Sequence, residues 1–175
     1  MPSDAHKALN DRLADVDQLM NGHTAIAGST RGRKYEVVGI NRAAILMLSA
    51  HLEGYVEDLF AEALSAVNSS LRGAAVTSGF HNPWPDRIDK LFAAIGMEQP
   101  CRSISWKKAS NKAVRGNLEL LVKRRNKIAH GTTDVTVYKE DVMRHRRYIE
   151  GFTERFDRAV RDHVKTLTGT FPWPP

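Results

Sequence analysis

The residues whose types and spacing could do chemistry lie in the stretch LLVKRRNKIAHG, residues 120–131. Arg125, Asn126 and His130 stand there in the order arginine, polar residue, three further residues, histidine. An imidazole can take up or release a proton near neutral pH, and a planar guanidinium binds the oxygens of a phosphate in a fixed geometry. Asn126 could orient either group or bind the phosphate itself. The stretch therefore predicts proton transfer beside a bound phosphate group.

Helix geometry limits how Arg125 and His130 could act together. Residues five apart on an ideal helix lie about 140° from each other, so the two side chains share no face while the helix continues. Gly131 follows the histidine, and glycine often closes a helix in the left-handed conformation. We therefore expect the helix to end at His130, where the imidazole can swing toward a ligand.

The charge of the chain is concentrated around this stretch. The formal net charge is +6, yet residues 102–127 alone hold nine lysines and arginines against one acid, Glu119. The remainder of the chain is close to neutral. A basic segment of this kind favours a polyanionic partner over an acidic one.

The elements that must position these residues are helices. Apolar residues recur at helical spacing over the ranges 4–20, 41–67, 86–96, 111–130 and 140–167. The second of these would be about 40 Å long, which suits the backbone of a bundle. Loops are expected at 22–39, where YEVV could begin the next helix early, and at 69–85 and 97–110; TTDVTVY is interpreted as a connector. The predicted fold is all-α: a bundle of four or five helices with a short accessory helix and long loops.

We expect one domain over residues 1–175, with its core at about 40–167, an N-terminal helix at 4–20 and a proline-rich tail at 168–175. The single cysteine, Cys101, excludes an internal disulfide and a multi-cysteine zinc site. No secretion signal and no apolar run of about 18 residues is found. These features predict a cytoplasmic protein that does not contact a membrane.

The sequence RNKIAH resembles the motif of HEPN domains, an all-α superfamily with many ribonucleases, including those of the RiboL-PSP-HEPN type. The segment LSAHLEGYVEDLF, residues 48–60, is similar to the HEPN helix that precedes the motif helix and carries an acidic residue, here Glu53 or Glu57. The resemblance in helix order covers most of residues 40–165. The specific part of this resemblance is the six-residue sequence RNKIAH.

The resemblance implies an endoribonuclease that needs neither a metal nor a cofactor. The 2′-OH of RNA would attack the neighbouring phosphorus, with Arg125 and His130 as the catalytic pair, Asn126 assisting, and Glu53 positioning Arg125. One imidazole cannot act as base and acid in the same step. The HEPN dimer, in which two motif helices line a shared cleft, would supply two copies of His130. The RNA-binding groove would then be lined by Arg115, Lys123, Arg124 and Lys127.

Several alternatives stay open at this level. By resemblance, such proteins serve as toxins or anti-phage effectors, with an antitoxin or another regulatory protein as a partner. The same fold could instead be an inactive HEPN-like module that binds a nucleotide or RNA, or one that only dimerises. In a purely structural interpretation, His130 caps a helix C-terminus and Arg125 pairs with Glu53 or Glu57. The phosphate-loop and serine-hydrolase motifs do not occur.

Overall fold

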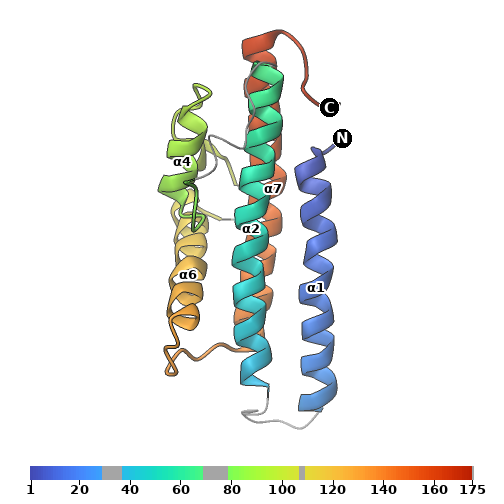
Figure 1. The fold of residues 1–175 in the computed structure, drawn as a ribbon, viewed down its shortest axis with the longest axis vertical. Coiled ribbons are helices and arrows are strands. Elements are labelled where there is room, and N and C mark those ends of the chain that lie inside the picture. Colours follow the sequence, from blue (N-terminus) through green and yellow to red (C-terminus); the bar gives the residue numbers. More distant parts are fainter. Residues whose placement is uncertain (29–36, 69–78, 107–108, 175) are drawn as a thin grey trace.

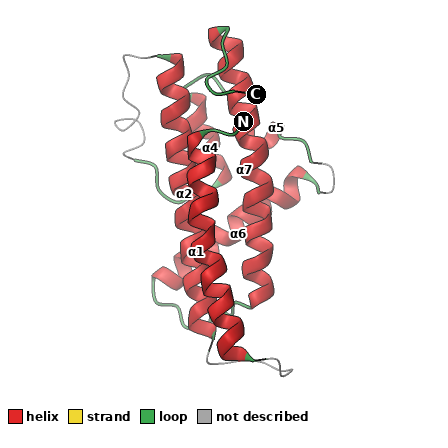
Figure 2. Cartoon of the chain, turned by 90° about the vertical axis from the view of Figure 1, so that its right-hand side faces the viewer, coloured by secondary structure: helices red, strands yellow, loops and turns green. Residues whose placement is uncertain are grey.

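The computed structural model describes residues 1–28, 37–68, 79–106 and 109–174. Its helices are α1 (Asp4–Ala27), α2 (Val38–Val67), α4 (Pro85–Ala93), α5 (Pro100–Ser103), α6 (Asn111–Ala129) and α7 (Lys139–Thr168). Over this part of the chain every element drawn in Figure 2 is helix or loop. The prediction of an all-α fold is confirmed.

The long helices lie side by side, and α2 is their common neighbour. It packs against α1, α6 and α7, and it also touches the shorter α4 (Figure 1). Its inward face holds two of the largest fully buried side chains, Tyr55 and Phe60. Phe60 contacts Phe92 of α4, which in turn contacts Phe156 of α7, each pair edge to face. One apolar core therefore ties α4 and α7 to the helix that carries Glu53.

Local sequence signals begin these helices. Ser3 caps α1, because its hydroxyl accepts a hydrogen bond from the N–H of His6. Ser110 caps α6 in the same way through the N–H of Ala113. Pro85 occupies the first turn of α4, where its missing N–H removes no helical bond. Each cap satisfies a backbone donor that the first turn leaves without a partner.

The sequence placed some boundaries wrongly. We expected the first helix to end at residue 20, but α1 continues to Ala27 because Met20 and His23 are buried against the bundle. Helix α2 begins at Val38, three residues before the predicted start. The link at 97–110 contains the short helix α5, which was not predicted. Parts of the predicted loops lie outside the described residues. Among them are 69–78 of the loop at 69–85 and 29–36 of the loop at 22–39, the latter including the first two residues of YEVV.

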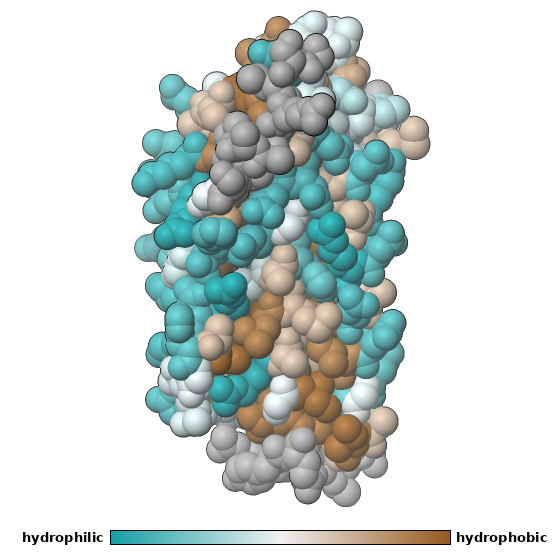
Figure 3. Space-filling view, in the orientation of Figure 1, coloured by the Kyte–Doolittle hydropathy of each residue, from teal (hydrophilic) through white to brown (hydrophobic). Residues whose placement is uncertain are grey.

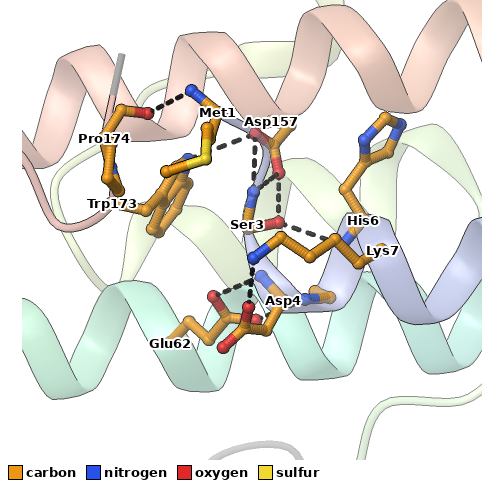
Figure 4. Close-up of polar contacts among 10 residues, drawn as sticks. Met1, Ser3, Asp4, His6, Lys7, Glu62, Asp157, Trp173 and Pro174 are labelled. Atoms are coloured by element: carbon orange, nitrogen blue, oxygen red, sulfur yellow. Dashed lines mark hydrogen bonds and ion pairs between the residues drawn. The ribbon is translucent and has the colours of Figure 1, made fainter.

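Both ends of the described chain meet at one buried carboxylate on α7, that of Asp157 (Figure 4). It accepts hydrogen bonds from the backbone N–H of Ser3, 3.3 Å away, and from the Ser3 hydroxyl. The indole N–H of Trp173 donates to it across 3.2 Å. The backbone N–H groups of Asp4 and Ala5 bind Glu62 of α2. The tail after α7 therefore packs on its own bundle beside the start of α1.

Hydrophobic residues gather on one part of the surface, over the adjoining lower ends of α1 and α2 (Figure 3). Near these ends of the two helices, Ile26 of α1 is exposed, and Ile40, Leu46 and Met47 of α2 are half-buried. The rest of this face is mostly polar. Among the helices that the structure describes, none combines the length and the apolar character required to cross a membrane.

Replacing Asp157 by alanine should lower the free energy of unfolding by about 3 kcal/mol, because buried donors on Ser3 and Trp173 would lose a charged acceptor. Urea denaturation monitored by circular dichroism measures this change. The control is Glu154→Ala, one turn earlier on α7, where an exposed pair with Arg158 is lost and about 0.5 kcal/mol or less is expected. Equal unfolding midpoints for both variants would contradict the assigned role of Asp157.

Candidate active site

Helix α6 ends where the motif requires it to end. His130 is the C-cap residue, and Gly131 follows with a φ of +77°, in the left-handed region. The N–H of Thr132 donates to the carbonyl of Lys127, and the N–H of Gly131 donates to that of Ile128, both over 3.0 Å. These two bonds form a Schellman motif, which satisfies the last carbonyls of the helix. The exposed His130 side chain thus leaves the bundle at a helix terminus.

The start of α2 fixes the connector that follows His130. Arg42 donates to the carbonyl of Thr132 over 2.7 Å and to that of Thr133 over 3.5 Å. The amide of Asn41 donates to the carbonyl of Val137 over 3.0 Å. Sequence reasoning did not find Arg42, because backbone carbonyls as partners leave no pattern in the residue types. The backbone beyond the histidine is therefore held at both ends.

Arg125 bends toward the helix face that carries the other two motif residues. Its Nη1 donates to the Oδ1 of Asn126 over 3.0 Å. Asn126 and His130 are four residues apart, so they are neighbours on one face of α6. The sequence left Arg125 about 140° away from His130, and this contact brings its guanidinium back toward that face. The half-buried guanidinium of Arg125 thus contacts the amide of Asn126, which lies one turn before the exposed imidazole of His130.

Glu53 is linked to Arg125 through another residue, Asn82, and makes no direct ion pair with it. The Oε2 of Glu53 accepts the N–H of Asn82 over 3.0 Å. The Oδ1 of Asn82 accepts from the Nη1 of Arg125, also over 3.0 Å. Glu57, the other acidic residue considered, lies one turn further along α2. Burial, followed by the charge of Glu53, raises the pKa of Glu57.

Sequence reasoning missed Asn82 and its neighbour His81. Both lie in a segment that glycine and proline mark as a loop, and a loop gives no periodic signal. Asn82 has a φ of +58°, a left-handed conformation that asparagine tolerates better than most residues. The Nδ1 of His81 is 3.9 Å from the Oε1 of Glu53. The dipeptide His-Asn before Pro83 is the one feature that could have pointed to this turn.

The four residues expected to line an RNA groove are placed differently from one another. Arg124 faces α7, where it lies 3.1 Å from Asp141 and has only 19% of its side chain exposed. Its spacing from the buried Leu121 and Ile128 explains this position, since residues three and four apart share a helix face.

Lys123 and Lys127 are exposed on α6. Arg115 pairs with Asp86 over 2.9 Å, and Lys123 lies 3.9 Å from Glu119. Part of the basic span, Lys107 and Lys108, lies outside the described residues.

Arg124 belongs to a buried polar cluster under the motif helix. Its Nη1 lies 3.1 Å from the Nε2 of His145 on α7. Burial, reinforced by the charges of Arg124 and Arg144, lowers the pKa of His145 to about 4. Burial alone would raise the pKa of Asp141, but the N–H of Tyr138 and the charge of Arg124 outweigh it and lower that pKa. The cluster therefore holds α6 against α7 with a neutral imidazole and an ionised carboxylate.

The amino-acid sequence matches the model of one protein family. The model described as RiboL-PSP-HEPN matches residues 67–162, which is more than half of the chain. The match contains α4, α6 and most of α7, and so includes Arg125, Asn126 and His130. Glu53 lies before its start. A search of curated proteins and a search of solved structures gave no match.

The buried imidazole should make stability depend on pH. His145 has a pKa of about 4 when folded and about 6.5 when unfolded. The unfolded chain therefore binds more protons between these values, and the free energy of unfolding should fall as the pH is lowered from about 6.5 to 4. The loss should reach about 3 kcal/mol. Below that range, protonation of Asp141 should add to it.

Urea unfolding at several pH values between 7 and 4 measures this dependence. The variant His145→Gln keeps a neutral polar side chain and should show a shallower slope. Burial also lowers the pKa values of His23 and His51, so part of the slope should remain. If the free energy of unfolding of the variant depends on pH as steeply as that of the wild type, His145 is not the source of this dependence.

Proposed function

We propose that this chain, which belongs to the RiboL-PSP-HEPN family, is a metal-independent endoribonuclease whose site is built on Arg125 and His130. Membership of the family supports a nuclease or RNA-related role. The observation that carries the finer proposal is the contact between Arg125 and Asn126, one turn before an exposed His130. We treat residues 1–175 as one HEPN-like domain, because α1 shares the core of the matched segment.

Arg125 is the residue that would bind the reacting phosphate. Its Nη1 is held by two amide oxygens, those of Asn82 and Asn126, while the side chain stays partly exposed. Neither contact neutralises its charge, because both acceptors are uncharged. A fixed cation of this kind stabilises the negative charge that develops on a phosphorane. Asn126 therefore serves as an orienting residue.

His130 would transfer protons. Its imidazole lies at the end of α6, outside the packed bundle, where solvent and substrate can reach it. The proposed reaction removes the proton of the 2′-OH and forms a bond from that oxygen to phosphorus. It breaks the bond from phosphorus to the 5′ oxygen, and that oxygen takes up a proton. The products are a 2′,3′-cyclic phosphate and a 5′-hydroxyl. Lys123 and Lys127, exposed on the same helix, would contact flanking phosphates and make binding depend on salt.

A homodimer would place two such sites together, as the HEPN resemblance implies. The apolar area on α1 and α2 supports this arrangement, because Arg42, at the same end of α2, holds the connector that follows His130. A role as a toxin or anti-phage effector, and an antitoxin or other regulatory partner, stay predictions from the resemblance. Localisation in the cytoplasm likewise stays a prediction.

Purified protein should cleave RNA in the presence of EDTA, and His130→Ala and Arg125→Ala should each lower the rate by about 100-fold or more. Denaturing gels with 3′-end analysis measure the rate and detect the cyclic phosphate. The matched control is Arg158→Ala, which removes an exposed arginine on α7 and should leave the rate unchanged. Binding of RNA by the wild-type chain without cleavage would instead support an inactive HEPN-like binding module.

Sedimentation at micromolar concentration should give a particle of twice the 19.6 kDa chain mass. Apolar surface at the ends of α1 and α2 provides the physical reason, because its burial stabilises association. The substitution Ile26→Glu places a charge at an exposed position of this area and should weaken the dimer. A wild-type monomer under these conditions would contradict the shared cleft.

A further inference from the structure

The segment His81–Asn82 is held from three sides beside the motif helix. Glu53 of α2 accepts the N–H of Asn82, and Arg125 of α6 binds its side chain. Arg87 of α4 donates to the carbonyl of His81 over 2.5 Å. Three elements thus fix two consecutive residues of a loop. Such fixation is what a group in a reactive site needs.

The backbone at Asn82 supports a role for this turn. Its φ of +58° is left-handed, a conformation that asparagine adopts more readily than most other residues. The conformation lets one residue direct its N–H toward Glu53 and its side-chain oxygen toward Arg125. Asn82 is therefore a positioning residue: it connects the carboxylate on α2 to the guanidinium on α6.

The imidazole of His81 lies on the open side of this arrangement. Its side chain is 71% exposed, whereas that of Glu53 beneath it is 20% exposed. The Nδ1 faces the Oε1 of Glu53 at 3.9 Å, which leaves Nε2, on the far edge of the ring, available to a ligand. This ion pair exists only when the imidazole is protonated, and a protonated imidazole has a proton to give.

A hollow with cationic walls begins next to His81. It is lined by Gly79, Phe80, Arg87, Lys90, Leu91 and Ala94. Two lysine or arginine side chains beside apolar ones suit a single nucleic-acid strand, whose phosphates need cations and whose bases need apolar contacts. A strand bound across Arg125 could continue from His81 into this hollow.

We propose that His81 is the second imidazole of the ribonuclease site, acting as the general acid that protonates the departing 5′ oxygen. The inference rests on the proposed ribonuclease activity. His130 takes the proton of the 2′-OH while the bond from the 2′ oxygen to phosphorus forms. As the bond from phosphorus to the 5′ oxygen breaks, His81 gives its proton to that oxygen. One imidazole gains a proton and the other loses one, so each chain carries a complete acid–base pair.

The charges around His81 fit this division of roles. Glu53 and Glu57 face it from α2, Arg87 approaches its backbone from α4, and Arg125 binds the next residue from α6. The Glu53 carboxylate lies 3.9 Å from His81, whereas His130 lies at the end of α6, one turn beyond Asn126. Arg125 contacts both Asn82, next to His81, and Asn126, one turn before His130. We therefore place the acid and the base on either side of the Arg125 guanidinium.

The test uses RNA that carries a sulfur atom in place of the bridging 5′ oxygen at the wild-type cut site. A thiolate leaves without protonation, so this substrate needs no general acid. His81→Ala should cleave ordinary RNA about 100-fold more slowly than the wild type and cleave the sulfur-bridged RNA at close to the wild-type rate. His130→Ala should be slow on both. His163→Gln, which changes a histidine bonded to the carbonyl of Ile95, is the control and should behave as the wild type.

Other outcomes overturn the inference in distinguishable ways. If His81→Ala cleaves ordinary RNA at the wild-type rate, or is equally slow on both substrates, His81 is not the acid. If His130→Ala is the variant that sulfur rescues, His130 is the acid and another group is the base. In each of these cases the ribonuclease proposal stands. A wild-type chain that cleaves neither substrate overturns both proposals. His81→Gln repeats the comparison, and circular dichroism verifies that each variant is folded.

Discussion

The termination of α6 at Gly131 is the constraint on which the candidate site depends. A continuing helix would carry Arg125 and His130 away on different faces. The left-handed glycine stops the helix, two backbone bonds close its end, and the imidazole is left at a free terminus. Arg42 then fixes the connector from α2. The left-handed conformation of Gly131 is thus the feature that leaves the His130 side chain at the end of α6 and not on the face of a longer helix.

A second principle is the division of the basic residues between structure and surface. Arg124 and Arg125 are adjacent in the chain, yet they turn in different directions. Arg124 forms an ion pair with Asp141 against α7, where an unpaired charge would be costly. Arg125 is bonded to neutral amides and keeps its charge available for a ligand. Net charge alone would have assigned both residues the same role.

The helices were predictable from the sequence because their signals are local. Apolar spacing located α2, α6 and α7 to within a few residues, and Gly131 marked the end of α6. The end of α1 was misjudged because Asn21, Gly22 and His23 suggest a break by themselves. Packing of Met20 and His23 against the bundle overrides that preference, as tertiary contacts often override local propensity.

The sequence by itself determined the motif residues, the helical class and the concentration of basic charge, all of which depend on residue type and on spacing within one element. The tertiary structure alone decided what surrounds the motif. Asn82 is 29 residues from Glu53 and 43 from Arg125 along the chain, and only the packing of α2, α4 and α6 brings the three together. The same packing turned Arg124 inward and left His81 exposed beside Glu53. Contacts of this range leave no periodic trace in one sequence, because they join elements whose relative placement the core determines.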